Sequence, residues 1–436
     1  MIIPMKIIRR YYLLLLFLLL FPVMYARINE VPRGVLWSDC EGYYLYLPAM
    51  FIIGDFHQLK EGSMWPQRNE QGEIVIKYTC GVALFECPFF LAAKWYCDAK
   101  GYDTPDYFNI HYCRAIAICG YFFGFLGLFF LRKALLQRGF SEKVAFWTLI
   151  AVFFGTNLFH YTTKEMGMSH VYSFCLFALL AWHTPRFLAR PGYRNALLLG
   201  GMLGWIVLIR PTGALAALFV ALYDVYSLSD LKKRGLFFLG HWPKLAAAAG
   251  AAFLLFVPQL LYWHEMTGHW LRWSYENEGF IYWNAPKIAA VLFDTQNGLF
   301  LYSPMALLMV AGVFAGLKTH RHHAPALLLI FSLATYVFAS WWAWWFGGAF
   351  GHRCYVEFYA LLAFPLAGVF KGIFSLKSGL LRRLVLAGIV FLMFYSVRMS
   401  FLYNYLLPPW DGEQWRWNPD KIIAVWSHLF DFLFPG

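Results

Sequence analysis

Long apolar stretches recur along the whole chain and alternate with shorter polar segments. Runs of roughly 17 to 25 apolar residues are long enough to cross a bilayer core of about 30 Å as helices. On this basis the sequence predicts eleven transmembrane spans, of which the fourth and fifth are short: 8–26, 109–131, 144–161, 169–183, 196–209, 211–228, 245–263, 298–317, 324–343, 355–370 and 384–405. The pattern is typical of an all-α polytopic membrane protein.

The polar segments differ in length and charge on the two sides of the predicted membrane. Lys and Arg residues that flank spans are retained in the cytoplasm. With the amino terminus inside, 20 of the 36 basic residues fall in short cytoplasmic loops that hold only three acidic residues. The opposite, outer side then carries the first outer loop 27–108 with juxtamembrane helices, the loop 264–297, the turn 344–354 and the tail 406–436. Long loops commonly carry function, so we expect the chemistry on that side.

Two outer segments have helical patterns of their own. Residues 79–97 could form a further span, but Glu86, Pro88 and Lys94 interrupt them, and a crossing there would move every later basic loop outside. We therefore predict a helix that lies on the membrane surface. In the tail, Asn418-Pro419-Asp420 predicts a helix start and an amphipathic helix along the outer leaflet. No repeat or linker divides the chain, which predicts one integral domain over residues 1–436.

Composition agrees with this class. The chain is 60% hydrophobic and 14% charged, with a mean hydropathy of +0.52, which excludes an ordinary soluble domain. The net charge of +12 comes mostly from the cytoplasmic loops, so it does not indicate nucleic-acid binding. The eight cysteines include no CxxC pair. A disulfide could form among Cys40, Cys80, Cys87 and Cys97, but free buried thiols are the favoured interpretation.

An acidic pair follows the first span. Ser38 to Glu41 fits a capping box, in which Glu41 reaches back to the cap amide and so has a structural role. Asp39 is not used by that motif and is the better candidate for a general base, with decoration of the helix dipole as the alternative. Tyr43 and Tyr44 follow at once, and aromatic faces suit both sugar rings and an isoprenoid chain, although interfacial tyrosines are also common.

Further polar residues lie at the outer mouth between the third and fourth spans. Glu165 and His170 could contribute with Asp39 to a divalent metal site, whereas a hydrogen-bonded structural histidine is the favoured alternative. Lys164 precedes them and must face water or a partner. The aromatic-rich loop 264–297 is interpreted as a lid that faces the acceptor.

Two arginines are candidates for binding a phosphate with paired donors. Arg210 is placed where the fifth span should emerge, and Arg353 follows Gly347, Gly348 and Gly351. The alternative is that each side chain snorkels to the lipid headgroups. The glycines allow a close backbone approach to a ligand, which snorkelling does not require.

A series of short motifs resembles a known family. In order they are Asp39 with its tyrosines, Lys77-Tyr78-Thr79 before Pro88-Phe89-Phe90, Met168-Ser169-His170, Arg210-Pro211-Thr212, Asn297-Gly298-Leu299-Phe300, Tyr302-Ser303-Pro304 and Gly347-Gly348 to Arg353. Over residues 6–405 the chain resembles the GT-C superfamily of integral-membrane glycosyltransferases that use polyprenyl-phosphate sugars. Within it the chain is similar to bacterial relatives of the aminoarabinose lipid A transferase and of protein mannosyltransferases.

The resemblance implies an inverting glycosyltransferase of the cell envelope, involved in glycan biosynthesis. Its donor would be a sugar on undecaprenyl phosphate, its acceptor a lipid, glycan or protein, and its active site would face the periplasm of a bacterial inner membrane. The resemblance matches the catalytic acid of the family to Asp39. Together with the residues discussed above, we expect catalysis by Asp39 and Glu41, donor phosphate binding by Arg353, Arg210 and Lys164, and substrate binding by Tyr43, Tyr44, Lys77, Tyr78 and His352. Cys40 separates the two acids that the family often has adjacent, and a divalent ion could share the charge of the phosphate.

Two other functions stay open from the sequence. A transporter or flippase of lipid-linked sugars would show internal repeats and ionisable groups at mid-membrane. Here the acids gather at the outer rim and no repeat is found, which favours the enzyme. A non-catalytic membrane scaffold is the third alternative.

Overall fold

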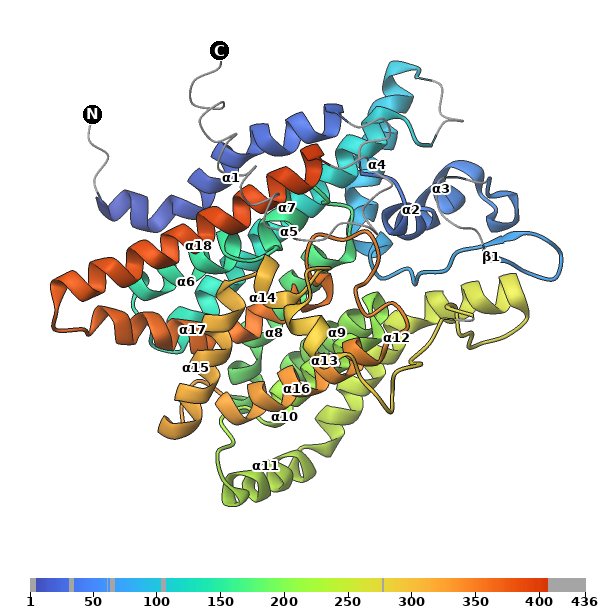
Figure 1. Cartoon of the computed structure of the whole chain (residues 1–436). Helices are drawn as coiled ribbons and strands as arrows, with labels where there is room; N and C mark the ends of the chain where they lie inside the picture. Colours follow the sequence, from blue (N-terminus) through green and yellow to red (C-terminus); the bar gives the residue numbers. More distant parts are fainter. Residues whose placement is uncertain are drawn as a thin grey trace, which may run out of the picture. The chain divides into compact units, whose positions relative to one another are not determined.

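The computed structural model describes residues 5–30, 35–60, 62, 67–102, 107–276 and 278–406, which form helices almost throughout (Figure 1). Contacts between the elements divide the chain into two compact units. The first unit comprises Met1–Ala134 and Tyr161–Glu278, and the second comprises Leu135–His160 and Gly279–Gly436. The prediction of one integral domain stays a prediction.

The first unit holds long helices and one small hairpin. Its elements are α1 (Met5–Glu30), α2 (Asp39–Tyr44), α3 (Tyr46–Pro48), the π-helix η1 (Ala49–Ile53), the 3-10 helix η2 (Phe56–Gln58), β1 (Gln67–Arg68), β2 (Ile74–Val75), α4 (Ala83–Lys100), α5 (Ile110–Gln137), α8 (Ser169–Ala189), α9 (Tyr193–Ile209), the 3-10 helix η3 (Pro211–Leu215), α10 (Ala216–Ala221), α11 (Leu228–Gly240) and α12 (Trp242–Thr267). Strands β1 and β2 pair antiparallel.

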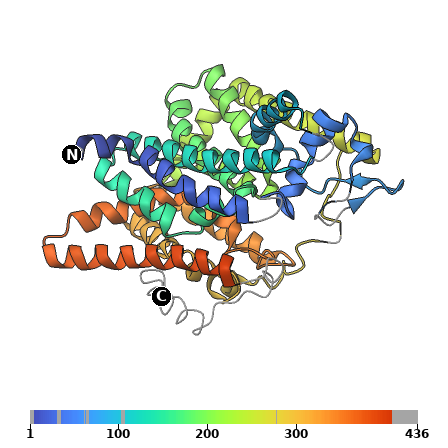
Figure 2. The same ribbon diagram turned by 90° about the horizontal axis from the view of Figure 1, so that it is seen from above.

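Close helix packing in the first unit depends on small residues and aromatic contacts. Helices α1 and α5 run side by side (Figures 1 and 2), and the Tyr121 hydroxyl of α5 donates to the carbonyl of Phe17 in α1. Helices α9 and α12 meet at Gly200, where a Cβ would collide with the backbone of Ala248. Glycine therefore lets these two backbones approach each other.

The second unit has a buried polar network at its centre. Its elements are α6 (Glu142–Phe154), α7 (Leu158–Thr163, which continues into the first unit), α13 (Ile288–Phe293), α14 (Leu299–Tyr302), α15 (Met305–Thr319), α16 (Ala324–Ser340), the 3-10 helix η4 (Arg353–Tyr355), α17 (Tyr359–Phe374) and α18 (Gly379–Leu406). The Tyr359 hydroxyl donates to Asn157 Oδ1 at 3.0 Å. The backbone N–H of Asn157 donates to Ser303 Oγ at 3.0 Å, and its side-chain Nδ2 donates to the Phe350 carbonyl at 3.1 Å. These bonds join Asn157 to three other parts of the unit, at a buried position where unsatisfied polar groups would be costly.

All eleven predicted apolar segments contain helices. Within the described part of the chain, four helices are long and apolar enough to cross a membrane: Tyr11–Asn29, Ile110–Gln137, Trp242–Thr267 and Gly379–Tyr403. Five shorter apolar helices accompany them among the described residues. These features are those of an all-α membrane protein, while the number of eleven spans stays a prediction.

Some local predictions can be compared with the structure directly. The capping box is wrong: Ser38 has φ 51° and its side chain makes no capping hydrogen bond. A cap side chain reaches the helix amides from a β-region backbone, which Ser38 does not have. The helix expected in 79–97 is present as α4, which is not among the helices long and apolar enough to cross. The predicted helix in the tail lies outside the described residues.

The cysteines are all free thiols. Seven are buried, and only Cys87 is partly exposed. Among those expected on the outer side, burial raises the pKa of Cys80 to about 12 and also raises the pKa of Cys87. The favoured interpretation of free buried thiols agrees with this, and such thiols carry little of the reactive thiolate.

Candidate active site

Asp39, the first residue of α2, is held by a tyrosine from a distant segment. The Tyr78 hydroxyl donates to Asp39 Oδ1 at 2.5 Å, a short charge-assisted bond that favours the ionised carboxylate. Burial, followed by the charge of Asp39, raises the pKa of Tyr78 well above 10, so this hydroxyl keeps its proton and remains a donor. Tyr78 is itself fixed, because its carbonyl accepts from the Tyr46 hydroxyl at 2.8 Å.

Tyr43 connects this pair to a cationic side chain. Its ring lies 4.7 Å from the ring of Tyr78, and its hydroxyl donates to Ser169 Oγ at 3.3 Å. Burial raises the pKa of Tyr43, Asp39 raises it further, and Arg210 lowers it. Both charges therefore act on the same buried phenol, which places a carboxylate and a guanidinium in one neighbourhood of the first unit.

Arg210 is positioned by a buried histidine. Its Nη1 lies 3.2 Å from Nδ1 and 3.4 Å from Nε2 of His170, whose ring stacks at an angle on Tyr161 with centroids 5.0 Å apart. A guanidinium can only donate hydrogen bonds, so the imidazole nitrogen that pairs with it must accept. His170 is 1% exposed, whereas Arg210 is only partly buried. The histidine thus supports the arginine from the protein interior.

A second cation lies beside Tyr78. Lys77 Nζ forms an ion pair with Glu278 at 2.6 Å and lies 4.9 Å from the centroid of the Tyr275 ring. Tyr275 in turn contacts Tyr78 edge-on at 6.4 Å. The sequence named the loop of Tyr275 as a lid but did not single out this residue, and its only signal was the aromatic-rich segment around it. The first part of that loop therefore reaches the Asp39–Tyr78 pair.

The segment with Lys164 and Glu165 packs tightly behind α2. A Cβ at Gly167 would lie 3.0 Å from Cys40 Cβ, and a Cβ at Gly120 of α5 would collide with the Met166 carbonyl. Position 120 therefore requires glycine, and at position 167 a Cβ would make a tight contact. Lys164 and Glu165 are buried, at 4% and 5% exposure.

The two acids of α2 have different surroundings. Glu41 is completely buried, and Gly62 lies so close that a Cβ there would overlap its carboxylate. Asp39 is partly exposed at the helix start. Of the two, Asp39 is the carboxylate that a substrate can reach.

The metal site expected at Glu165 and His170 stays a prediction. Among them, no three His, Cys, Asp or Glu side chains gather in a group that could hold an ion. His170, one of the two side chains expected to contribute, faces the Arg210 guanidinium instead. A cation at that nitrogen opposes metal binding there by charge repulsion.

Two other predicted site residues, His352 and Tyr44, are buried in the cores of their own units, whereas Arg353 is only partly buried. In the second unit, His352 is 1% exposed, donates through Nε2 to the Trp344 carbonyl at 3.1 Å, and packs on Phe338 with ring centroids 5.5 Å apart. Arg353 follows it as the first residue of η4. In the first unit, the Tyr44 hydroxyl donates to the Tyr107 carbonyl at 2.5 Å. His352 and Tyr44 thus have structural contacts, and the residues brought together in the first unit are Asp39, Tyr43, Lys77, Tyr78, His170 and Arg210.

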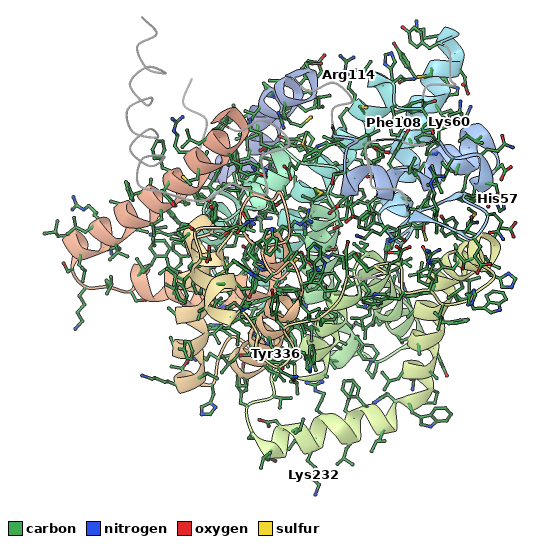
Figure 3. The ribbon with its side chains drawn as sticks, turned by 45° about the vertical axis from the view of Figure 1, so that its right-hand side comes forward. His57, Lys60, Phe108, Arg114, Lys232 and Tyr336 are labelled. Carbon is green, nitrogen blue, oxygen red and sulfur yellow. The ribbon has the colours of Figure 1, made fainter. Side chains whose placement is uncertain are left out.

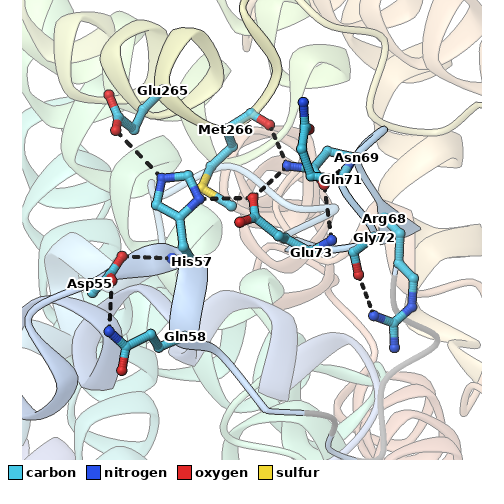
Figure 4. A network of polar contacts seen from close by, with 10 residues as sticks. All are labelled: Asp55, His57, Gln58, Arg68, Asn69, Gln71, Gly72, Glu73, Glu265 and Met266. Carbon is cyan, nitrogen blue, oxygen red and sulfur yellow. Dashed lines mark hydrogen bonds and ion pairs between the residues drawn. The ribbon is translucent and has the colours of Figure 1, made fainter.

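An outer network fastens the segment that carries Lys77 and Tyr78 (Figures 3 and 4). We call Asp55, His57, Asn69, Glu73 and Glu265 the outer clasp. Nδ1 of His57 lies 2.8 Å from Glu73 Oε2, and Nε2 lies 3.5 Å from Glu265 Oε1 at the end of α12. Asn69 donates to Glu73 at 2.8 Å and to the Met266 carbonyl at 3.0 Å. The clasp joins η2, the hairpin and α12, and Glu73 raises the pKa of His57 chiefly through its hydrogen bond.

Comparison with known proteins supports the architecture. No model of a protein family matches the chain, and no curated protein matches it either. Among solved structures, the archaeal oligosaccharyltransferase AglB from Archaeoglobus fulgidus, in complex with an inhibitory peptide and a dolichol-phosphate, is similar with a TM-score of 0.51 and 11% sequence identity. The similarity covers 94% of this chain but only 57% of that one. It shows a shared fold, in agreement with the GT-C-like fold that the sequence motifs imply.

Proposed function

We propose that this protein is an inverting glycosyltransferase that moves a sugar from a polyprenyl phosphate carrier, undecaprenyl phosphate, to a lipid, glycan or protein acceptor. The reaction would take place at the periplasmic face of a bacterial inner membrane. The observation that carries the proposal is the Asp39 carboxylate, held by Tyr78 in the same neighbourhood as Arg210. The similar oligosaccharyltransferase contains a dolichol-phosphate and a peptide, which supports a lipid-phosphate donor and leaves the acceptor class open.

In this mechanism Asp39 acts as general base. It takes the proton from an acceptor hydroxyl as that oxygen forms a bond to the anomeric carbon of the sugar. The bond from the anomeric carbon to the phosphate oxygen breaks, and the polyprenyl phosphate leaves with the electron pair. Attack from the opposite face inverts the configuration, and the phosphate needs no proton to leave.

The leaving phosphate gains charge that a cation must stabilise. Arg210, oriented by His170, presents N–H donors that suit a phosphate, and such donors commonly contribute about 10²-fold or more to a rate. Lys77 forms an ion pair with Glu278, so the carboxylate offsets its charge. This suits a role in holding the donor sugar or the loop. Arg353 and Lys164 remain further proposed contacts of the phosphate.

The direct test compares wild type with Asp39→Asn. Purified protein in liposomes is given a labelled polyprenyl-phosphate sugar together with lipid, glycan and peptide acceptors. We expect Asp39→Asn to bind the donor normally and to lose about 10²-fold or more in turnover. Asp55→Asn is the matched control, because Asp55 is another acid of the same outer loop that bonds only locally to the His57 amide at 2.9 Å and to Gln58. It should remain within about twofold of wild type.

The same assay separates the alternatives. Normal turnover by Asp39→Asn would remove this residue from the mechanism. A flippase would move label between the leaflets without forming a glycosidic bond, and a scaffold would do neither.

A further inference from the structure

Helices α4 and α5 of the first unit leave an open groove between them. The groove has a volume of about 260 Å³ and is lined by Phe89, Ala92 and Ala93 of α4 and by Arg114, Ala115 and Ile118 of α5. Small side chains make room on both helices, and aromatic and aliphatic side chains form the walls. None of these residues belongs to the Asp39 site.

One end of the groove is positively charged. His111 and Arg114 lie in the first two turns of α5, where the helix dipole is positive. Arg114 Nη2 donates to Asn29 Oδ1 at 3.1 Å, and its guanidinium carbon lies 5.7 Å from the centroid of the Tyr25 ring. A cation at this end of a helix is unfavourable by itself and is stabilised by an anion.

Nearby acids in the described part of the chain do not supply that anion. Asp98 on α4 already forms an ion pair with Lys94 at 2.7 Å. Arg114 forms no ion pair within the described residues, and its Nε is buried there without a hydrogen-bond partner. The groove therefore combines an apolar wall with a cationic end whose charge is not neutralised by those residues.

The face around the groove is suited to lipid. Helix α5 is one of the four long apolar helices, and Ile118 and Phe122 on it are 37% and 40% exposed. On α4, Trp95 and Tyr96 are 73% and 40% exposed. Tryptophan and tyrosine concentrate at the level of the headgroups, which places the cationic end at the membrane boundary.

We propose that this groove binds one anionic phospholipid, with its phosphate at Arg114 and His111 and an acyl chain along Phe89, Ala92 and Ile118. Charge complementarity selects an anionic headgroup, because a zwitterionic one brings a cation of its own to the same end. Helix α4 follows directly after the Lys77–Cys80 segment. A lipid that joins α4 to α5 would therefore stabilise the segment that carries Tyr78.

The test measures lipid binding without any turnover, so it is independent of the proposed function. Short-chain phosphatidylglycerol and phosphatidylcholine are titrated into the full chain in detergent, and bound lipid is counted by native mass spectrometry. Wild type should bind one phosphatidylglycerol about tenfold more tightly than phosphatidylcholine, and Arg114→Gln should abolish that preference. Lys232→Gln is the matched control, because Lys232 is an exposed cation on α11, far from Arg114 within the same unit (Figure 3). It should bind like wild type.

A second variant addresses the apolar wall. Ala92→Phe fills the groove and leaves the charge at Arg114 intact, so it should weaken the binding of both lipids by a similar factor. Arg114 also contacts α1, so thermal melting checks that each variant is folded. If Arg114→Gln is not folded, the result for Ala92→Phe alone decides the test. Binding that is unchanged in Ala92→Phe, or a preference retained by folded Arg114→Gln, would overturn the proposal. Displacement of phosphatidylglycerol by an equal concentration of polyprenyl phosphate would also overturn it, because the groove would then belong to the carrier.

Discussion

Replacing Tyr78 by phenylalanine removes the hydroxyl that donates to Asp39, the carboxylate that we place at the centre of catalysis. The hydroxyl lies 2.5 Å from Asp39 Oδ1, and hydrogen bonds to charged groups contribute about 1.5–3 kcal/mol. Asp39 is partly exposed, so water can replace part of the lost interaction, and the lower end of that range applies. Since about 1.4 kcal/mol corresponds to tenfold in rate, Tyr78→Phe should reduce kcat/KM about tenfold.

The pH dependence of Tyr78→Phe distinguishes a catalytic effect from a structural one. The Tyr78 hydroxyl favours the charged carboxylate, so its loss should shift the acidic limb of the kcat/KM profile to higher pH. Tyr43→Phe is the control, because its hydroxyl bonds the neutral Ser169 at 3.3 Å. It should lose less activity and leave the acidic limb where it is.

A double-mutant cycle tests whether Tyr78 acts through Asp39. The assay is transfer of labelled sugar by protein in nanodiscs across a pH series. In the Asp39→Asn background, Tyr78→Phe should cause little further loss, because the charge that it stabilises is already absent. If Tyr78→Phe costs its full tenfold in that background, the two residues act independently and the reasoning is refuted.

Three further predictions concern the phosphate contact, the outer clasp and the packing behind α2. Arg210→Lys keeps the charge but loses the paired donors, so the donor KM should rise about tenfold, and an unchanged donor titration would count against a phosphate contact. The pKa of His57 is raised from its usual 6.5, so its contribution to stability is lost as pH rises through that raised pKa. The pKa of Glu73 is lowered from 4.5, so its contribution to stability is lost as pH falls through that lowered pKa. The melting temperature of wild type should therefore exceed that of His57→Gln most between pH 4.5 and 6.5, and a difference that is flat with pH would contradict this. Gly120→Ala would push a methyl group into the Met166 carbonyl and should cost about 1–3 kcal/mol of stability, measured as a lower melting temperature that an unstrained site would not show.

The helices could be predicted because their signal is local. Each apolar run needs only its own length and composition to indicate a buried or membrane-spanning helix, and the structure has helices in all eleven segments. The capping box was also predicted from local sequence alone. Four residues fit the motif, but the backbone at Ser38 adopts φ 51° and its side chain makes no capping hydrogen bond. The start of α2 packs against a distant segment, since Cys40 contacts Gly167, and no short motif contains that contact.

The candidate site could be predicted only in part. Asp39 was identified from its position after an apolar run, but its hydrogen-bond partner is 39 residues away, and Tyr78 entered only through family resemblance. The contact between Arg210 and His170 joins residues 40 positions apart and gives no periodic signal at all. It links two residues to which the sequence gave separate roles, so that the histidine supports the arginine.

None of the eight cysteines forms a disulfide, which gives the chain a practical property. Because seven thiols are buried, a water-soluble maleimide should react with little except the partly exposed Cys87. That reaction should itself be slow, because burial raises the pKa of Cys87. Cys87→Ser would then provide a silent background for reporter cysteines placed one at a time in each connecting segment. Labelling from one side of sealed vesicles would count the crossings directly.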